Sequence, residues 1–269
     1  MGFLSSIGQK TANHANDWRE NLSFLGESLV WSLKALVRPR LFRFGDFFLA
    51  FQRASYGGLP ITICIGFLLG VILAFQTAAV LKTFGVETFV ANMLAIALFR
   101  ELGPVITAVI LAGRTGSAFA AEIGTMKVNE ELDALTTMGL PPVRFLVLPR
   151  VGAAILAMPL LTIFCELSGL IGGAIVLQAM GVPTVVFWRG VAKSTTAFMI
   201  CEGLTQGALF GMLVGLIGCL SGVRTQSSSD GVGRATTSAV VWSIVAIVFT
   251  DGLLAVITYV WGIGMSIEI

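Results

Sequence analysis

The sequence is poor in charged residues: Asp, Glu, Lys and Arg make up only 12% of its 269 residues, about half the fraction found in soluble domains. Hydrophobic residues make up 56%, and the mean hydropathy is +0.90. A helix needs ~20 mostly apolar residues to cross a bilayer, and several runs here are longer. The composition therefore predicts a polytopic membrane protein rather than a soluble domain.

The common signatures of catalysis are also missing. The only histidine is His14, so neither a Ser/His/Asp set nor an HExxH metal site can be assembled. No GxxxxGK[ST] phosphate loop occurs. The four cysteines lie in apolar stretches without paired spacing, which argues against a disulfide framework or a thiolate metal site. We expect no enzymatic activity, metal or cofactor, and any ATP hydrolysis that drives transport belongs to another chain.

Two further absences narrow the function. The net charge is only +2 and no basic stripe is interleaved with aromatic residues, so a nucleic-acid partner is not expected. The N-terminal residues MGFLSSIGQKTANHANDW are polar where a signal peptide has its apolar core, so we expect no cleaved signal.

What the sequence does contain is a series of long apolar stretches. Each is long enough to cross a membrane; they cover roughly 58–81, 88–112, 147–178, 197–221 and 239–262. The third is overlong and holds Pro149 and Pro159, which can bend a helix. It can be one tilted span. Alternatively, 143–178 can be a re-entrant pair, which would add a crossing and place the C-terminus on the opposite side of the membrane.

A more polar segment, 21–54, precedes these stretches. Its leucines recur at helical spacing and are followed by phenylalanines among arginines, which favours an amphipathic helix in the plane of the membrane interface. An ordinary soluble amphipathic helix is the alternative. The predicted fold class is therefore an all-α membrane protein with an N-terminal interfacial helix and about five transmembrane helices. We divide it into an N-terminal region with the interfacial helix (1–57) and a transmembrane domain (58–269).

The distribution of lysine and arginine predicts the orientation, because cytoplasmic flanks are enriched in both. With five spans and the N-terminus inside, thirteen of these residues are cytoplasmic and three are external. The cytoplasmic ones number seven in 1–57, four in 113–150 and two in 223–238; the external ones number one in 82–87, two in 179–196 and none in 263–269. The N-terminus is predicted to be cytoplasmic and the C-terminus external.

Small residues at four-residue spacing predict where helices touch. They are Gly66 and Gly70, Gly169 and Gly173, and Gly207, Gly211 and Gly215. Such spacing allows close backbone approach where lipid provides no hydrophobic drive for association. The contacts can lie within one subunit or between two.

Charged residues inside the spans are the candidates for function. Arg100 and Glu101 lie mid-span, where a charge costs ~2.5–3.5 kcal/mol on the most lenient scale. They can line a polar cavity and contact a charged head group, or they can form a structural salt bridge near Pro104. The acids Glu166, Glu202 and Asp251, and Gln76, leave the same choice open.

The polar segment 113–142 joins the second and third spans. Its helical part is predicted from about Ser117 to Met138, ended by Gly139 and two prolines. A short helix held at the membrane surface is suited to docking on a cytosolic partner. A solvated connecting helix is the alternative.

Two strings in the sequence carry a family resemblance. They are FRELGPVITAVILAGRTGSAFAAEIGTMKVNEELDALTTMGLPPVRFLVLPR (99–150) and GVGRATTSAVV (231–241), the second followed by Asp251. In them the chain resembles the permease subunit of the MlaE/YrbE family of ABC transporters. The resemblance extends from Gly66 to the last span.

The resemblance implies a homodimeric permease in the bacterial inner membrane. Its implied partners are two copies of a cytosolic ABC ATPase, a periplasmic MCE-domain protein and a small STAS-domain protein, and its cargo is phospholipid moved between the inner and outer membranes. Segment 113–142 would be the coupling helix, with candidate coupling residues Arg114, Ser117, Glu122, Glu130 and Glu131.

The same resemblance places Arg100 and Glu101 beside a lipid-binding cavity. It adds a face of the first span: Leu69, Ile72, Leu73, Gln76 and Thr77. Family members more often carry an aromatic residue on this face; Ala78 and Ala79 stand here instead, which predicts a wider cavity wall. The lipid's apolar tails and anionic head group fit an apolar cavity with a cation near one end.

Two other functions remain open at this point. An ion-coupled secondary transporter could use Glu101, Glu166, Glu202 and Asp251 as a proton relay, although such proteins usually contain inverted repeats and no convincing repeat is found here. A membrane scaffold without transport activity would leave Arg100 and Glu101 unexplained.

Overall fold

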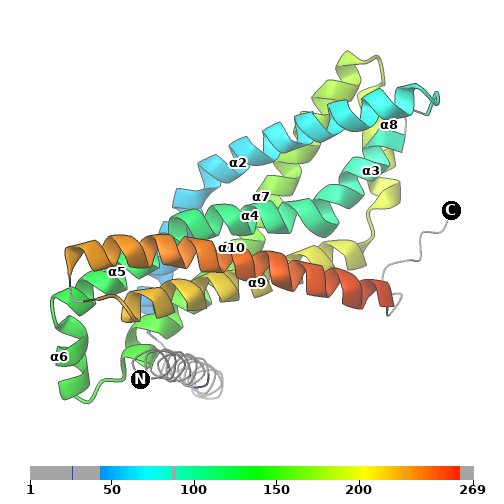
Figure 1. Ribbon diagram of the computed structural model, residues 1–269. Coiled ribbons are helices and arrows are strands. Elements are labelled where there is room, and N and C mark those ends of the chain that lie inside the picture. Colours follow the sequence, from blue (N-terminus) through cyan, green and yellow to red (C-terminus); the bar gives the residue numbers. More distant parts are fainter. Residues whose placement is uncertain (1–25, 27–42, 87–88, 227, 261–269) are drawn as a thin grey trace, which may run out of the picture.

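The computed structural model describes Gly26 and residues 43–86, 89–226 and 228–260, and these ranges form helices joined by short turns, without a strand (Figure 1). Five helical rods are long and apolar enough to cross a membrane. They are Phe44–Lys82, Val90–Val128, Val143–Ala179, Ala197–Val223 and Ser229–Val260. The all-α fold class and the five predicted spans are thus confirmed.

Most rods correspond to single helices, but the second and third contain π-helical turns. The first rod is α2 (Phe44–Lys82); the second joins α3 (Val90–Ala97), α4 (Gly103–Leu111) and α5 (Ser117–Val128) through π-helical turns at Leu98–Leu102 and Ala112–Gly116. After α6 (Glu131–Thr137), the π-helical turn Val143–Val147 leads into α7 (Leu148–Ala179). The chain continues through α8 (Thr184–Ser194), α9 (Ala197–Val223) and α10 (Ser229–Val260).

The predicted interfacial helix at 21–54 lies mostly outside the described residues. Its last part, from Phe44, forms the beginning of α2, where the Phe47 ring contacts the rings of Phe48 and Phe51 with centroids 5.3 and 6.2 Å apart. Helix α2 runs without a break across the predicted boundary at 57/58. The division into two regions remains a prediction.

The third span is one continuous helical run from Val143 to Ala179, about 55 Å long. Pro149 follows directly after the π-helical turn Val143–Val147, in the first turn of α7, and Pro159 lies inside the helix. The re-entrant alternative for 143–178 is therefore wrong, and the length implies a tilted span or one that extends beyond the hydrocarbon core.

Helix α7 is the centre of the bundle, and glycines bring its neighbours close. A Cβ on Gly70 of α2 would overlap the Gly169 carbonyl of α7, and a Cβ on Gly211 of α9 would fall 2.5 Å from the Ala154 carbonyl of α7. Gly66, Gly173, Gly207 and Gly215 face neighbouring helices in the same way. The predicted small-residue contacts are thus contacts within one chain.

The segment between the second and third spans differs from its prediction in one respect. The helix expected over about Ser117–Met138 is interrupted at Asn129 and Glu130, where Glu130 adopts a left-handed conformation with φ 62°. Its end is as predicted: Gly139 has φ 72° and the Leu140 N–H donates to the Leu135 carbonyl, closing α6 before the two prolines.

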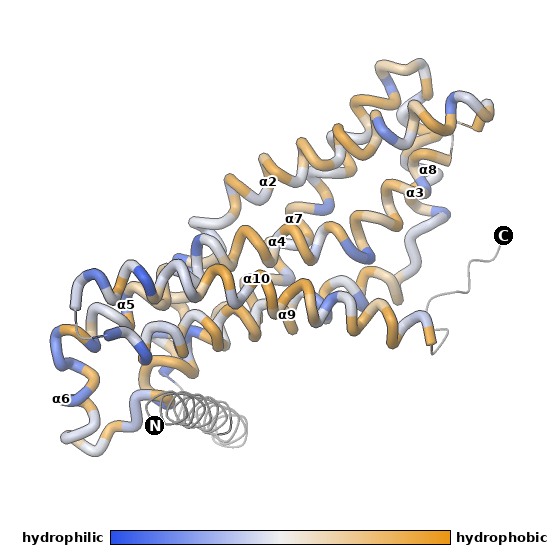
Figure 2. The backbone as a smooth tube through the Cα atoms, viewed as in Figure 1, coloured by the Kyte–Doolittle hydropathy of each residue, from blue (hydrophilic) through white to orange (hydrophobic). Residues whose placement is uncertain are grey.

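Hydrophilic residues gather at the α5–α6 end of the molecule and around α8 at the opposite end, whereas hydrophobic residues cover the rods between them (Figure 2). A hydrophilic spot interrupts the second rod between α3 and α4. A membrane would surround the apolar middle of the bundle, leaving this spot inside it.

Replacing Gly70 by Ala should destabilise the protein by about 1–3 kcal/mol, because the new methyl group must push α2 away from the Gly169 carbonyl. Gly252→Ala on α10 is the matched control, since a Cβ there meets nothing within 4 Å and should be neutral or add up to ~1 kcal/mol of helix propensity. Thermal unfolding in mild detergent measures both. Equal melting temperatures for the two variants would contradict the close-contact argument.

Candidate functional site

A cavity of about 330 Å³ lies between the second rod, α9 and α10. Both charged residues predicted from the second span, Arg100 and Glu101, line it. The rest of its wall comes from one face each of α9 and α10: Phe198, Cys201, Glu202, Thr205, Gln206 and Leu209, and Asp251, Leu254, Ala255 and Thr258.

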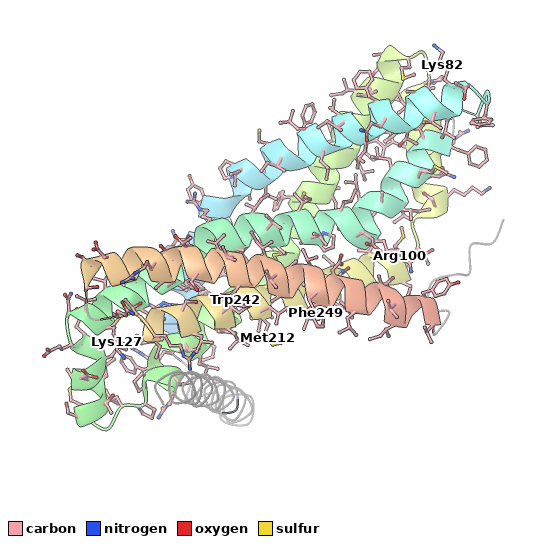
Figure 3. All side chains as sticks on the ribbon, viewed as in Figure 1. Lys82, Arg100, Lys127, Met212, Trp242 and Phe249 are labelled. Carbon is pink, nitrogen blue, oxygen red and sulfur yellow. The ribbon has the colours of Figure 1, made fainter. Side chains whose placement is uncertain are left out.

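The cavity belongs to the half of the bundle that lies away from α6. Its α9 residues come from the first half of that helix and its α10 residues from the last third. Arg100 is ten residues from the start of the second rod at Val90, or about 15 Å along the axis. Figure 3 shows Arg100 nearer to the end marked by Lys82 than to the end marked by Lys127.

The local backbone explains why two consecutive charged residues face one cavity. Pro104 cannot donate a backbone hydrogen bond, and its ring would clash with the carbonyl four residues earlier, that of Arg100. The helix widens here into the π-helical turn Leu98–Leu102, in which the Gly103 N–H donates to the Leu98 carbonyl. Such turns occur mostly as single insertions in α-helices, frequently at functional sites.

A glycine brings α9 against this widened turn. A Cβ at Gly203 would overlap the Phe99 carbonyl and lie 3.6 Å from the Pro104 ring. Glu202 and Gln206, on the same part of α9, are thereby held beside Arg100 and Glu101. The position of the cavity thus follows from one helix distortion and one glycine.

Polar contacts inside the cavity are few. The Gln206 Nε2 donates to Asp251 Oδ1 at 2.5 Å, joining α9 to α10. Arg100, Glu101 and Glu202 make no hydrogen bond or ion pair with any side chain in the part of the chain that the structure describes. Nor do acidic, Cys or His side chains in that part form a group of three able to hold a metal ion. The charged side chains are left to interact with whatever enters the cavity.

The intramembrane acids thus separate into two groups. Glu202 and Asp251 join Glu101 at the cavity, whereas Glu166 is 2% exposed on α7 and packs against Gly103. Sequence reasoning named Glu202 and Asp251 as candidates and left their role open, but it missed the rest of the α9 face. Its signal was present: Glu202, Thr205 and Gln206 are spaced as neighbours on one side of a helix in an otherwise apolar span.

The five residues predicted on the first span are not part of this cavity wall. Leu69 and Leu73 pack partly buried against the apolar core, Thr77 is half-buried, and Ile72 and Gln76 are exposed on α2. In one chain they lie on a different helix from those that form the cavity. Their role in lipid binding remains a prediction.

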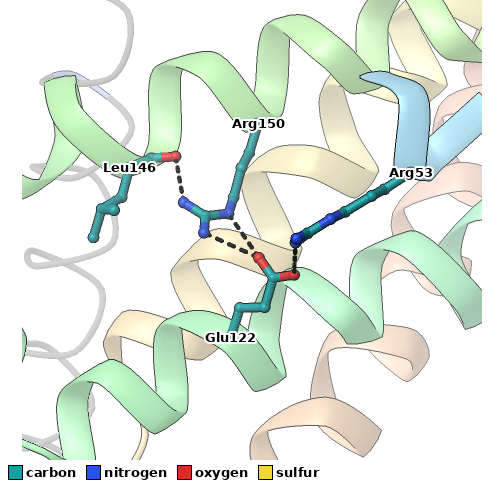
Figure 4. Close-up of polar contacts among 4 residues, drawn as sticks. All are labelled: Arg53, Glu122, Leu146 and Arg150. Atoms are coloured by element: carbon teal, nitrogen blue, oxygen red, sulfur yellow. Dashed lines mark hydrogen bonds and ion pairs between the residues drawn. The ribbon is translucent and has the colours of Figure 1, made fainter. Parts of the chain in front are cut away.

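Glu122 is the centre of a polar contact at the α5 end of the bundle (Figure 4). Its carboxylate accepts from Arg53 of α2 at 3.0 Å and from Arg150 of α7 at 3.0 and 3.4 Å. Arg150 also donates to the Leu146 carbonyl at 3.0 Å. Glu122 therefore ties α5 to both α2 and α7.

The other predicted coupling residues fall into two sets. Arg114 is exposed and its side chain lies against Gly57 of α2, and the hydroxyl of the half-buried Ser117 donates to the Gly113 and Arg114 carbonyls. Glu130 and Glu131 are exposed at the turn and on α6. Arg114, Glu130 and Glu131 are thus all exposed in this chain, and their role in coupling remains a prediction.

Comparison with known proteins agrees with this arrangement. The family described as Permease MlaE matches residues 47–257, which include all three elements of the cavity and the Glu122 contact. The chain belongs to the MlaE permease family. It is therefore a multi-pass membrane permease of the ABC type, and the resemblance in the two sequence strings is confirmed.

Individual relatives cover most of this MlaE-family permease. A probable ABC transporter permease protein of Rickettsia bellii is 33% identical over 94% of this chain and 96% of its own length. The intermembrane phospholipid transport system permease protein MlaE of Haemophilus influenzae is 32% identical over 88% and 97%. The Arabidopsis thaliana protein TRIGALACTOSYLDIACYLGLYCEROL 1, chloroplastic, is 35% identical over 76% and 59%.

Truncating Glu122 should destabilise the bundle more than truncating Arg53. Glu122→Ala leaves Arg150, whose side chain is 18% exposed, without its carboxylate, at a cost of about 1–3 kcal/mol. Arg53 is 62% exposed, so Arg53→Ala should cost less than about 1 kcal/mol. Thermal unfolding of both purified variants in detergent tests this. A larger loss of melting temperature in Arg53→Ala than in Glu122→Ala would show that Glu122 does not hold the three helices together.

Proposed function

We propose that this chain is the membrane subunit of an ABC transporter that moves phospholipids between the inner and outer membranes. The observation that carries the proposal is the cavity: in a permease of this family, apolar groups meet charged side chains that have no ion pair among the described residues. The relative from Haemophilus influenzae is named as an intermembrane phospholipid transport permease.

The cavity suits the head group of a phospholipid in size and composition. Its volume of about 330 Å³ is at the small end for ligand pockets, enough for a head group but not for a whole two-tailed lipid. Arg100 supplies a cation for the phosphate. The tails would lie along the apolar wall formed by Phe198, Leu209 and Leu254.

The transporter is proposed to be a homodimer served by three other proteins. These are a cytosolic ABC ATPase in two copies, a periplasmic MCE-domain protein and a small STAS-domain protein. Helix α10 supports further assembly, since Trp242, Val245 and Phe249 are more than half exposed along an apolar face. Within the described part of one chain, no other helix covers these side chains.

Helix α6 is the proposed docking element for the ATPase. It stands out from the α5 end of the bundle (Figure 1), and Glu131 and Asp133 on it are exposed while Leu132 anchors it to the core. A displacement of α6 would move α5, and the ion pairs of Glu122 would transmit that movement to α2 and α7. ATP binding would then reshape the cavity by moving the second rod.

The proposed orientation follows from the charge count. The N-terminus and the α5–α6 end are cytoplasmic, and the C-terminus is periplasmic. The cavity then lies in the periplasmic half of the inner membrane, on the side from which a periplasmic partner would receive or deliver lipid.

A second candidate, ion-coupled transport, gains some support because Glu101, Glu202 and Asp251 line one cavity. Carboxylates grouped inside a membrane are typical of proton relays. The two candidates differ in their energy source and their partners.

Purifying the tagged chain in mild detergent should recover an ATPase, an MCE-domain protein and bound phospholipid, identified by mass spectrometry. Arg100→Gln should lower the bound phospholipid about tenfold, because a charge-assisted hydrogen bond to phosphate is lost. Arg189→Gln on α8, outside the cavity, is the control and should retain the lipid. Recovery of neither ATPase nor lipid, with substrate uptake that follows a proton gradient, would favour ion-coupled transport.

Reversing the charges on α6 should weaken binding of the ATPase without unfolding the permease. We expect Glu131→Lys combined with Asp133→Lys to lower the recovered ATPase at least fivefold, a loss of about 1 kcal/mol, while the melting temperature stays unchanged because both side chains are exposed. Lys193→Glu on α8, at the opposite end, should leave recovery unchanged. Full recovery from the α6 variant would place the docking surface elsewhere.

A further inference from the structure

The charges of the cavity are unbalanced. Among the described residues that line it, Arg100 is the one cation, and Glu101, Glu202 and Asp251 are the acids. They come from three different rods, so the imbalance is a property of the assembled cavity and not of any one helix. A ligand that carried only negative charge would find one attractive side chain and three repulsive ones.

Three of these side chains have no polar partner within the described ranges. Asp251 accepts a hydrogen bond from Gln206 at 2.5 Å. For Arg100, Glu101 and Glu202, no ion pair or hydrogen bond joins them to one another or to any other described side chain. Charges at membrane depth are costly when unpaired. A ligand that brings both a negative and a positive group would satisfy both kinds of side chain.

We propose that the cavity selects phospholipids whose head group carries a primary ammonium, as in phosphatidylethanolamine, over phospholipids with a purely anionic head group. The phosphate would pair with Arg100, and the ammonium, with three N–H donors, would bind the carboxylates of Glu101, Glu202 and Asp251. This inference rests on the proposed function, since it names the class of phospholipid that the cavity takes.

The same geometry distinguishes two kinds of ammonium. A choline head group has the positive charge but no N–H, so it keeps the electrostatic attraction and loses the hydrogen bonds to the carboxylates. The expected order of preference is ethanolamine, then choline, then glycerol head groups. If the cavity selected by charge alone, choline and ethanolamine lipids would bind in equal amounts.

The test uses the complete transporter, purified with its partners and reconstituted into vesicles of equal parts phosphatidylethanolamine and phosphatidylglycerol. The complex is repurified and its bound lipids are quantified by mass spectrometry. We expect ethanolamine lipid to exceed glycerol lipid at least fivefold, corresponding to about 1 kcal/mol. Equal amounts, or an excess of phosphatidylglycerol, would overturn the inference. A second set of vesicles with phosphatidylcholine in place of phosphatidylglycerol tests the hydrogen-bond component.

Neutralising the acids should abolish the preference. Glu202→Gln should reduce the ratio, and Glu202→Gln with Asp251→Asn should bring it near one. Asp230→Asn is the matched control on α10: it is exposed, lies about 32 Å along the helix from Asp251, and should keep the wild-type ratio. If the double variant does not fold, the wild-type ratio and Glu202→Gln decide the question. An unchanged ratio in Glu202→Gln would overturn the role of that carboxylate.

Failure of this inference can be told apart from failure of the proposed function. Bound phospholipid in the proportions of the vesicle would leave the lipid permease intact and remove only its head-group preference. A complex that retains no phospholipid of any kind would contradict the proposed function itself.

Discussion

The structure depends on close contact between helix backbones, because lipid offers apolar side chains an environment as favourable as another helix does. Glycines supply that contact on two sides of α7. Gly70 of α2 meets Gly169, and Gly211 of α9 meets Ala154. Helix α7 is the most buried of the five spans for this reason, and α10, on the outside, is the least buried. Packing thus determines which helices form the core and which remain available to lipid or to a second chain.

The cavity forms where a close backbone contact of this kind lies beside a distorted helix. Gly203 lets α9 approach the π-helical turn at the Phe99 carbonyl, and that turn exists because Pro104 cannot complete a regular helix. Side chains on both sides of the contact then point into a common space. The charged residues gather along this space, which is partly open to the outside of the chain: Glu101 is exposed, whereas Arg100, Glu202 and Asp251 are half-buried.

Sequence reasoning predicted the features that depend on local pattern. Long apolar runs specified five spans, four-residue glycine spacing located the helix contacts, and Gly139 with two prolines marked the end of α6. The break at Glu130 was not predicted, because neither glycine nor proline marks it. Glu202 and Asp251 were named as candidates, but the other residues of the α9 and α10 walls were missed because helical periodicity defines a face but not the helix that it will meet. Glu122 was expected to serve a partner, yet its carboxylate is engaged by two arginines of its own chain.

The second rod gives a physical route between the proposed ATPase side and the cavity. It contains Arg100 near one end and Glu122 near the other, separated by about 33 Å of continuous helix, and α6 follows directly after it. A helix of this kind transmits a displacement along its axis with little loss, while the π-helical turns at Leu98–Leu102 and Ala112–Gly116 are places where it can bend. Because Glu122 fastens α5 to α2 and α7, movement of α6 must either carry those helices along or strain that contact. In the proposed coupling, either outcome would shift the second rod relative to α9 and so change the shape of the cavity between them.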